Sequence, residues 1–328
     1  MKASHRRQRG AALLMAMLTV TLVATFAAAS MWQQWRSVEV EQAERTRVQA
    51  GWILTGALDW ARLILREDNA AADYLSEPWA VPLEEARLST FLAAEKGVAT
   101  VTSGDEAIDA FLSGEIIDMQ SMLNVNDLVE SGQVSPVAML RFRRLFELLG
   151  LPASQLTALA ENLRFALDTS VENRSSPMAP LVPQQMEQLV WLGVAPQTVS
   201  VIKPYVTLLP LPNRPLVNLN TAKAEVIYAS VAGLSMADAQ RLVAARDRSY
   251  FRSVAEASRL VPALDPSAFG SVVGVASGFF ESHGRLRLGT TVIEERSLLH
   301  RVSPMVRALR RERGVAQAPP PGSTLPGR

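Results

Sequence analysis

The chain has 328 residues, 48% of them hydrophobic, and a formal net charge of +1. The length allows one or two folded domains besides a membrane segment, and the near-zero charge gives no general case for nucleic-acid binding. The chain has no cysteine, which excludes disulfides, thiolate nucleophiles and cysteine-ligated zinc.

The N-terminus carries a segment that is long and apolar enough to cross a bilayer. Ala11–Trp35 contains no charged residue, proline or glycine, and a membrane-spanning helix needs about 20 such residues. The ten residues before it contain Lys2, Arg6, Arg7 and Arg9 and no acid, which predicts a cytoplasmic N-terminus with the rest exported. A secretory signal peptide is the alternative, but its apolar core has only roughly 7–15 residues.

Helical periodicity continues after the apolar segment. No glycine lies between Gly10 and Gly51, and Leu54, Leu58, Ala61 and Leu65 form one apolar stripe. We therefore predict a single helix from Ala11 to Arg66, half of it in lipid and half packed on a folded domain.

Short strands are expected in the stretch Glu67–Ser121. Pro78 and Pro82 are predicted to break the helix and to begin an extended crossing over a sheet face. Val98–Thr102 and Ile108–Met119 have the composition of strands.

The stretch Asn124–Val261 is predicted to be mostly helical and inserted between strands. Asn126 is a good helix N-cap, and Ser135-Pro136 is a typical helix start. Gln155–Leu167 reads as a further helix.

The most specific motif begins at Val217 and resembles a helix-hairpin-helix module of the competence DNA-binding type. Asn220 or Thr221 is expected to cap its first helix, and Gly233 to supply the tight turn. The segment Asn124–Asp127 echoes Asn218–Thr221, which suggests a pairing of similar helical starts. The predicted motif residues are Asn124, Asn126, Asn218, Asn220, Thr221 and Gly233.

The charge of this module favours a packing role over a DNA-binding role. The stretch between Pro215 and Pro262 has six basic and four acidic residues, a small surplus for phosphate contacts. The turn also has one glycine where DNA-binding versions usually have two. We therefore favour a packing scaffold and expect no nucleic acid.

After Pro262 the pattern returns to strands. Phe279–Gly284 reads as a strand that runs into a turn, Arg285–Val292 as a half-buried strand, and Glu294–Val302 as the last strand. These strands are expected to pair antiparallel with the early ones. The proline- and glycine-rich tail Gly314–Arg328 is predicted to be disordered.

The N-terminal architecture resembles the type IV pilin superfamily. The resemblance implies that prepilin peptidase cuts after Gly10 and that Ala11 becomes the methylated mature N-terminus. The superfamily usually has glutamate at the fifth mature position, where this chain has Met15. The glutamate neutralises the N-terminal ammonium of a neighbouring subunit, so its absence suits a subunit with none above it.

Seven segments, in their order and spacing, resemble the K-type minor pseudopilins of type II secretion: Arg9–Ala24, Gly51–Leu65, Ile116–Val129, Arg141–Leu151, Ile202–Pro210, Val217–Ile227 and Gly274–Arg301. The resemblance implies an α+β, pilin-like fold with a long N-terminal helix on an antiparallel sheet. It also implies a large inserted all-α domain with the helix-hairpin-helix-like module. We expect a leader (1–10), a transmembrane and stem helix (11–67), a first sheet part (68–123), the inserted domain (124–263), a second sheet part (264–313) and a disordered tail (314–328).

The resemblance implies a tip subunit of the pseudopilus that primes assembly with the I-type and J-type minor pseudopilins. The chain would sit in the inner membrane with one span and its bulk in the periplasm. A membrane-anchored helix-hairpin-helix DNA receptor and a type IV pilus tip subunit stay as alternatives.

Metal binding and catalysis are not expected. Related proteins often hold calcium in an acidic loop, but the corresponding stretch Leu167–Pro183 keeps only Asp168, Glu172 and Asn173, and calcium takes six to eight oxygens. The histidines are His5, His283 and His300, and no catalytic motif accompanies them. We read His283 as an exposed loop residue.

Overall fold

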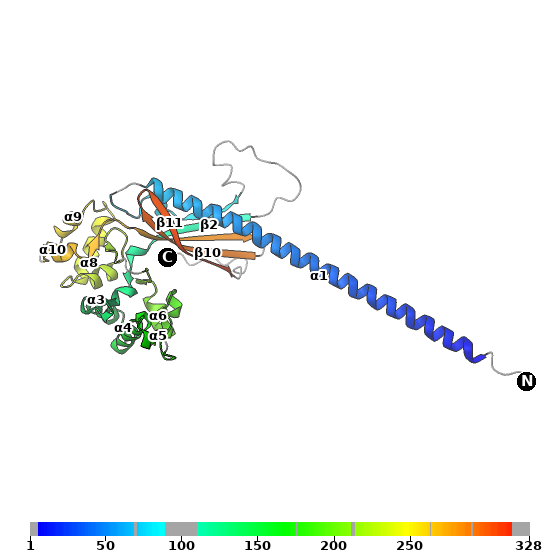
Figure 1. The fold of residues 1–328 in the computed structure, drawn as a ribbon. Coiled ribbons are helices and arrows are strands. Elements are labelled where there is room, and N and C mark those ends of the chain that lie inside the picture. Colours follow the sequence, from blue (N-terminus) through cyan, green and yellow to red (C-terminus); the bar gives the residue numbers. More distant parts are fainter. Residues whose placement is uncertain are drawn as a thin grey trace, which may run out of the picture. The chain divides into compact units, whose positions relative to one another are not determined.

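The computed structural model describes residues 6–68, 71–88, 110–174, 176–210, 214–262, 264–289 and 291–316. The chain divides into two compact units, Met1–Thr55 and Gly56–Arg328. Helix α1 spans Arg6–Glu67, so it supplies the described part of the first unit and the opening turns of the second (Figure 1).

α1 begins earlier than the sequence predicted, and proline is not what ends it. It begins at Arg6, ahead of Ala11, and its last residue is Glu67, well before Pro78. Pro78 instead opens a short 3-10 helix, η1 (Pro78–Ala80). The residue after the helix is Asp68, and its carboxylate accepts a hydrogen bond from Arg301. The helix therefore ends beside an ion pair with a residue that is distant in the sequence.

One five-stranded antiparallel sheet forms the β layer of the second unit. Its order is β1-β2-β9-β10-β11. The strands are β1 (Leu83–Arg87), β2 (Ala110–Asp118), β9 (Phe279–Leu288), β10 (Thr291–Val302) and β11 (Met305–Ala316). β2 pairs with β9, with Gly114 opposite Gly284, so the predicted pairing of early with late strands is confirmed.

Several strand predictions were wrong in detail. β9 runs through Gly284 to Leu288, and the chain turns at Gly289, where φ is +56°. Glu294–Val302 lies in β10, which β11 follows, and β11 includes Gly314–Ala316 of the predicted tail. β1 pairs with β2 at the sheet edge instead of crossing a face, while Val98–Thr102 lies outside the described residues.

The last turns of α1 pack on this sheet, as predicted. Leu58 and Leu65 join Phe280, Leu299 and other apolar side chains in one buried cluster. The ring of Trp79 meets Phe280 edge to face, with centroids 5.1 Å apart. Burying one such side chain contributes roughly 1.5–3 kcal/mol, so the cluster is a main support of the helix.

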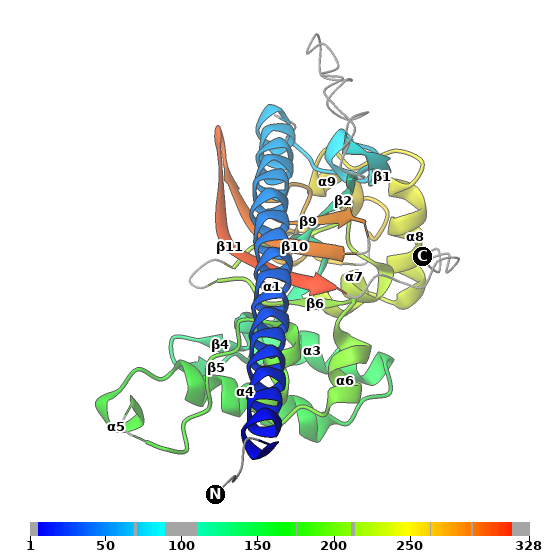
Figure 2. The ribbon, with the colours of Figure 1, turned by 90° about the vertical axis from the view of Figure 1, so that its right-hand side faces the viewer.

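The region between β2 and β9 is mainly helical and forms two groups of helices (Figure 2). Its first half contains η2 (Met119–Ser121), β3 (Leu123–Asn124), η3 (Val125–Leu128), β4 (Val129–Glu130), β5 (Gln133–Val134), α3 (Pro136–Leu148), α4 (Ala153–Leu167), α5 (Val171–Arg174), η4 (Met186–Leu192), α6 (Pro196–Ile202) and β6 (Val206–Thr207). Its second half contains β7 (Val217–Asn218), α7 (Ala224–Ser230), α8 (Met236–Arg246), α9 (Val254–Ser258), α10 (Pro266–Gly270) and β8 (Val273–Gly274).

Short strands close each half of this region, so the prediction of an all-α domain was too strong. β3 pairs in parallel with β6, and β7 pairs in parallel with β8. The stretch from β3 to β6 and the stretch from β7 to β8 therefore each begin and end at one two-residue ladder. A shared apolar core, which includes Phe142, Leu163 and Ile227, extends across both halves.

Candidate functional site

The N-terminal part of α1 has the length and composition of a membrane-crossing helix. The described side chains of residues 11–45 are all exposed. The hydroxyls of Thr19, Thr21 and Thr25 donate to carbonyl oxygens three residues earlier, at 2.8 to 2.9 Å. Because an unsatisfied polar group in hydrocarbon costs several kcal/mol, these internal bonds suit the segment to lipid.

The expected processing bond lies inside this helix, since α1 already begins at Arg6. Ala11 and Met15 are exposed on it. Counted from the predicted cut after Gly10, Met15 is the fifth residue and its side chain is apolar. Processing between Gly10 and Ala11 therefore stays a prediction.

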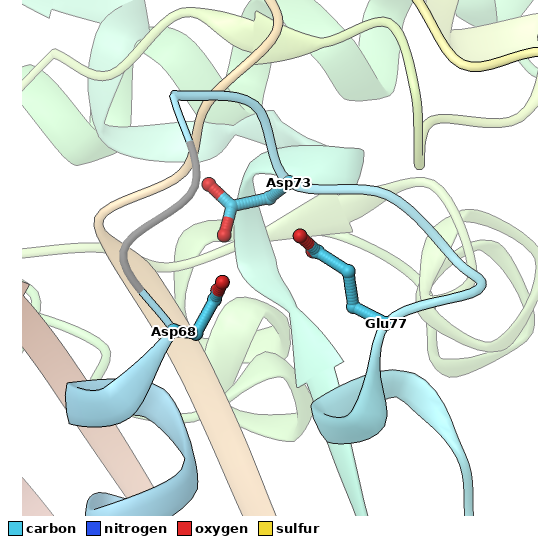
Figure 3. A group of neighbouring side chains, drawn as sticks. All are labelled: Asp68, Asp73 and Glu77. Carbon is cyan, nitrogen blue, oxygen red and sulfur yellow. The ribbon is translucent and has the colours of Figure 1, made fainter.

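Three carboxylates converge just after α1 (Figure 3). Oxygen atoms of Asp68, Asp73 and Glu77 lie within 4.8 Å of one another. Asp68 follows the last turn of α1, while Glu77 precedes η1. Such a group could hold a cation, so its other contacts decide what it does.

Arg301 of β10 already supplies the positive charge at this group. Its Nη1 donates to Asp68 Oδ2 at 2.7 Å, and its Nη2 donates to Asp73 Oδ1. Glu77 Oε2 accepts from Trp79 Nε1 at 2.7 Å and from the N–H of Tyr74 at 2.9 Å. Because these donors occupy oxygens that a metal would need, the contacts favour a structural role over metal binding. We call the group formed by Asp68, Asp73, Glu77 and Arg301 the junction.

Burial perturbs the acids of this junction. Asp73 is fully buried, and burial raises its pKa to about 7, although the N–H of Ser277 and the Arg301 guanidinium oppose the rise. Burial also raises the pKa of Glu77. The protonation of Asp73 therefore changes near neutral pH.

Asp118, the last residue of β2, extends the junction to the inserted region. Its Oδ2 accepts from Asn218 Nδ2 at 3.1 Å, from Thr221 Oγ1 at 2.5 Å and from Ser277 Oγ at 2.7 Å. Burial raises the pKa of Asp118 against these hydrogen bonds. Asn218 Nδ2 also donates to the carbonyl oxygen of Asp73 at 3.1 Å, so one amide links the two acids.

The two asparagine motifs take similar structural roles. Asn124 Oδ1 accepts from the N–H of Asn126, and Asn218 Oδ1 accepts from the N–H of Asn220. The second asparagine of each motif then reaches across the fold: Asn126 Nδ2 donates to Leu209 O at 2.8 Å, and Asn220 Nδ2 donates to Phe251 O at 3.0 Å.

The predicted capping residues were therefore misassigned. Asn124, not Asn126, caps η3, and Lys223 precedes α7 without a side-chain cap. The physical reason is that each motif begins at the last residue of a two-residue strand, Asn124 of β3 and Asn218 of β7, and its second asparagine bonds to a distant backbone carbonyl. Ser135 does cap α3 ahead of Pro136, as predicted.

The helix-hairpin-helix-like module consists of α7 and α8. Gly233 has φ of +79° in the turn between them, as the sequence predicted. Arg246, at the end of α8, donates from Nη1 to Leu219 O and Ala222 O, both at 2.5 Å. A guanidinium bonded inward in this way favours the packing role over phosphate binding.

The stretch Leu167–Pro183, which corresponds to the calcium loop of related proteins, makes local hydrogen bonds. Asn173 is buried and donates to Phe165 O at 2.8 Å and to Asp168 O at 2.7 Å. Asp168 Oδ1 accepts from the N–H of Ser170, and nothing is described for the side chain of Glu172. Within the described residues this loop contributes to no cluster of three ligating groups.

His283 is not the exposed loop residue that we predicted. It lies within β9, with Nε2 at 2.6 Å from Glu281 Oε2 and Nδ1 at 3.4 Å from Glu115 Oε1. His300 stacks on Phe279 at 4.3 Å between ring centroids, and His5 lies outside the described residues. These contacts give both described histidines structural partners.

Sequence reasoning missed the residues that hold the junction together: Asp73, Asp118, Ser277 and Arg301. They stand alone in unrelated segments, and no spacing joins them. Only the fold brings them together, although the neighbouring Asn218 and Thr221 were singled out for another reason.

Comparisons with known proteins agree with this architecture. Family models described as "Type II secretion system (T2SS), protein K" match residues 121–211 and 217–275, the two halves of the inserted region. Type II secretion system protein K of Pseudomonas aeruginosa PAO1 is 26% identical over 273 residues, which cover 76% of this chain and 75% of that protein.

A solved structure also matches the fold. The crystal structure of the GspK-GspI-GspJ complex from the type 2 secretion system of enterotoxigenic Escherichia coli contains a chain that aligns with a TM-score of 0.61 at 20% identity. The alignment covers 83% of this chain and 98% of that one. Since separate models of one family match both halves of the insertion, and the pilin-like fold agrees, the chain belongs to the type II secretion system protein K family of minor pseudopilins, which are structural proteins and not enzymes.

Proposed function

We propose that the chain caps the tip of a type II secretion pseudopilus and primes its assembly with I-type and J-type minor pseudopilins. The family membership and the complex named for the Escherichia coli structure support this proposal. The observation that carries it is the combination of an apolar α1 segment with a broad inserted region on one chain.

In this proposal α1 anchors the chain in the inner membrane as a single span, with the N-terminus in the cytoplasm and the bulk in the periplasm. The basic residues before Gly10 hold the precursor there. Prepilin peptidase then cuts between Gly10 and Ala11, and the freed helix bundles with similar helices through the packing of apolar side chains. Met15 leaves no carboxylate for a subunit above, which suits the terminal position.

Processing is tested by replacing Gly10. We expect Gly10→Phe to leave the leader attached, as the mass of the purified chain would show, and to abolish secretion. Ala3→Phe is the matched control, because it adds the same side chain within the leader but away from the cut. Normal processing of Gly10→Phe would refute the leader assignment.

The tip position is tested by adding a tag after Arg328, beyond the last paired residue of β11, and labelling sheared fibres with gold. Label at fibre ends only, together with co-purification of both partner pseudopilins in mild detergent, is the expected result. Label along the fibre length would contradict the capping role. A DNA receptor would instead bind duplex DNA in a salt-dependent way.

A further inference from the structure

β11 leaves one edge of the sheet open. It pairs with β10 from Met305 to Ala316, and among the described residues no strand pairs with its outer side. An edge of 12 residues presents backbone N–H and C=O groups that a second polypeptide can pair with.

The edge is irregular at one point. Leu298 lies opposite Arg310 and Leu299 opposite Ala308, so Leu309 is an extra residue in β11. Such a bulge re-aims side chains. Leu309 is 45% exposed, so it presents apolar surface at the edge.

A cavity of about 260 Å³ adjoins this bulge. Leu309 and Arg310 of β11 line it, together with Leu298 of β10 and with Val182, Leu209 and Asn126 of the inserted region. Asn126 is 9% exposed, and its Oδ1 finds no hydrogen-bond partner in the part of the chain that the structure describes. Apolar side chains make up most of the wall of this cavity.

The excess of positive charge on β11 favours an acidic strand as its pairing partner. The strand has four arginines and one glutamate: Arg307, Arg310, Arg311, Arg313 and Glu312. Arg311 and Arg313 also bind the buried Glu295 of β10. Two such edges would repel each other, whereas an acidic strand would be attracted.

We propose that β11 and the adjoining cavity form a strand-addition site for an extended acidic segment of a partner polypeptide. The segment pairs with the edge of β11 and places one large apolar side chain in the cavity beside Leu309. In strand addition, main-chain hydrogen bonds supply affinity and a side-chain pocket supplies specificity. The site does not depend on the proposed tip position, since a peptide alone tests it.

The test uses the full chain in lipid nanodiscs and a fluorescein-labelled peptide, Asp-Thr-Asp-Thr-Leu-Thr-Asp-Thr-Asp, followed by anisotropy. We expect saturable binding that weakens about tenfold when serine replaces the leucine or when alternate peptide nitrogens are methylated. Binding should also weaken as salt is raised, because the charges are exposed.

Two variants of the chain locate the site. Leu309→Asp should weaken binding about tenfold, because it puts a charge at the cavity beside an acidic ligand. Leu140→Asp is the matched control: Leu140 is 47% exposed on α3, away from the cavity, and should bind within about twofold of the parent. Both positions are surface leucines, so neither substitution should change the thermal unfolding transition. Arg307→Glu is a second variant of the β11 edge, and it should also weaken peptide binding.

Several results would overturn the proposal. Equal binding of the methylated peptide would exclude strand pairing, and equal binding of a lysine-for-aspartate peptide would exclude the charge selection. Unchanged binding by Leu309→Asp, or no saturable binding up to about 1 mM peptide, would exclude the site itself.

Discussion

Asn218 Nδ2 donates to Asp118 Oδ2 at 3.1 Å, although the two residues are 100 positions apart in the chain. Asp118 ends a strand of the pilin-like sheet, while Asn218 lies in the ladder that opens the second half of the insertion. Their hydrogen bond therefore fastens the helical insertion to the sheet. Both residues are buried, so the bond has no competition from water.

Removing this amide should be costly. Asn218→Ala removes the donor to Asp73 O and the acceptor for the Asn220 N–H. Asp118 Oδ2 keeps its bonds from Thr221 and Ser277. Since one unsatisfied buried group costs about 1–3 kcal/mol, we expect a loss of about 3–5 kcal/mol in the free energy of unfolding.

Thermal unfolding of the full chain in detergent measures this loss. Asn162→Ala is the control, because Asn162 is partly buried and its side chain makes one hydrogen bond within the described residues, to Leu192 O at 3.0 Å. It should cost about 1 kcal/mol. If the two variants lost similar amounts of unfolding free energy, Asn218 would not have the special stabilising role that we assign to it in the junction.

Gly114 should not tolerate a side chain. A Cβ on Gly114 would lie 2.7 Å from the carbonyl oxygen of His283 on the neighbouring strand, and that oxygen belongs to the backbone. We expect Gly114→Ala to cost more than about 2 kcal/mol through displacement of β9. Far-UV circular dichroism and the unfolding midpoint report it, and a midpoint equal to that of the parent would show that the strands can separate there.

Gly233 and Gly56 should respond oppositely to alanine. Gly233 has φ of +79° and Leu264 Cδ2 lies 3.4 Å from its hypothetical Cβ, so Gly233→Ala should destabilise by about 1 kcal/mol or more. Gly56 lies in α1, with nothing within 4 Å of the added Cβ, so Gly56→Ala should stabilise by about 0.5–1 kcal/mol. Parallel denaturation curves test the contrast, and equal shifts would be inconsistent with it.

Stability should fall as pH rises from about 4 to about 7. Burial raises the pKa of Asp73 to about 7 and that of Asp127 to about 6, whereas an unfolded aspartate has a pKa of about 3.9. A raised carboxyl pKa contributes stability that is complete below the unfolded pKa and is lost as pH rises through the folded value. Glu187, Asp238 and Glu281 have lowered pKa values, and their contribution is lost only at lower pH.

The unfolding midpoint in buffers of constant ionic strength measures this slope. Asp127→Asn should flatten it, because the amide keeps an oxygen for Asn124 Nδ2 but cannot titrate. A midpoint that stays level or rises with pH would show that Arg301 and Arg214 hold these acids ionised throughout.

Local patterns revealed a large part of the fold. The charge-free run after Gly10 and the stripe of Leu58, Ala61 and Leu65 predicted a long helix with one buried face, and these three side chains are buried. Gly233 predicted the hairpin turn for a local reason, its positive φ. Each of these signals depends on residues within a few turns of one another.

Contacts between distant segments could not be read in the same way. Gly284 suggested a turn, but it lies opposite Gly114 where β2 and β9 run side by side. Asp73 and Arg301 form an ion pair across 228 positions, and neither belongs to a motif. For the same reason the junction was missed while its neighbours Asn218 and Thr221 were noticed.

The two parallel ladders, β3 with β6 and β7 with β8, bring the ends of each half of the insertion together at neighbouring backbone positions. A segment whose ends meet can change length within its loops without stretching the protein that carries it. Because the two halves share one apolar core, we expect such changes to be tolerated in the loops of each half, while removal of a whole half would expose the core of the other.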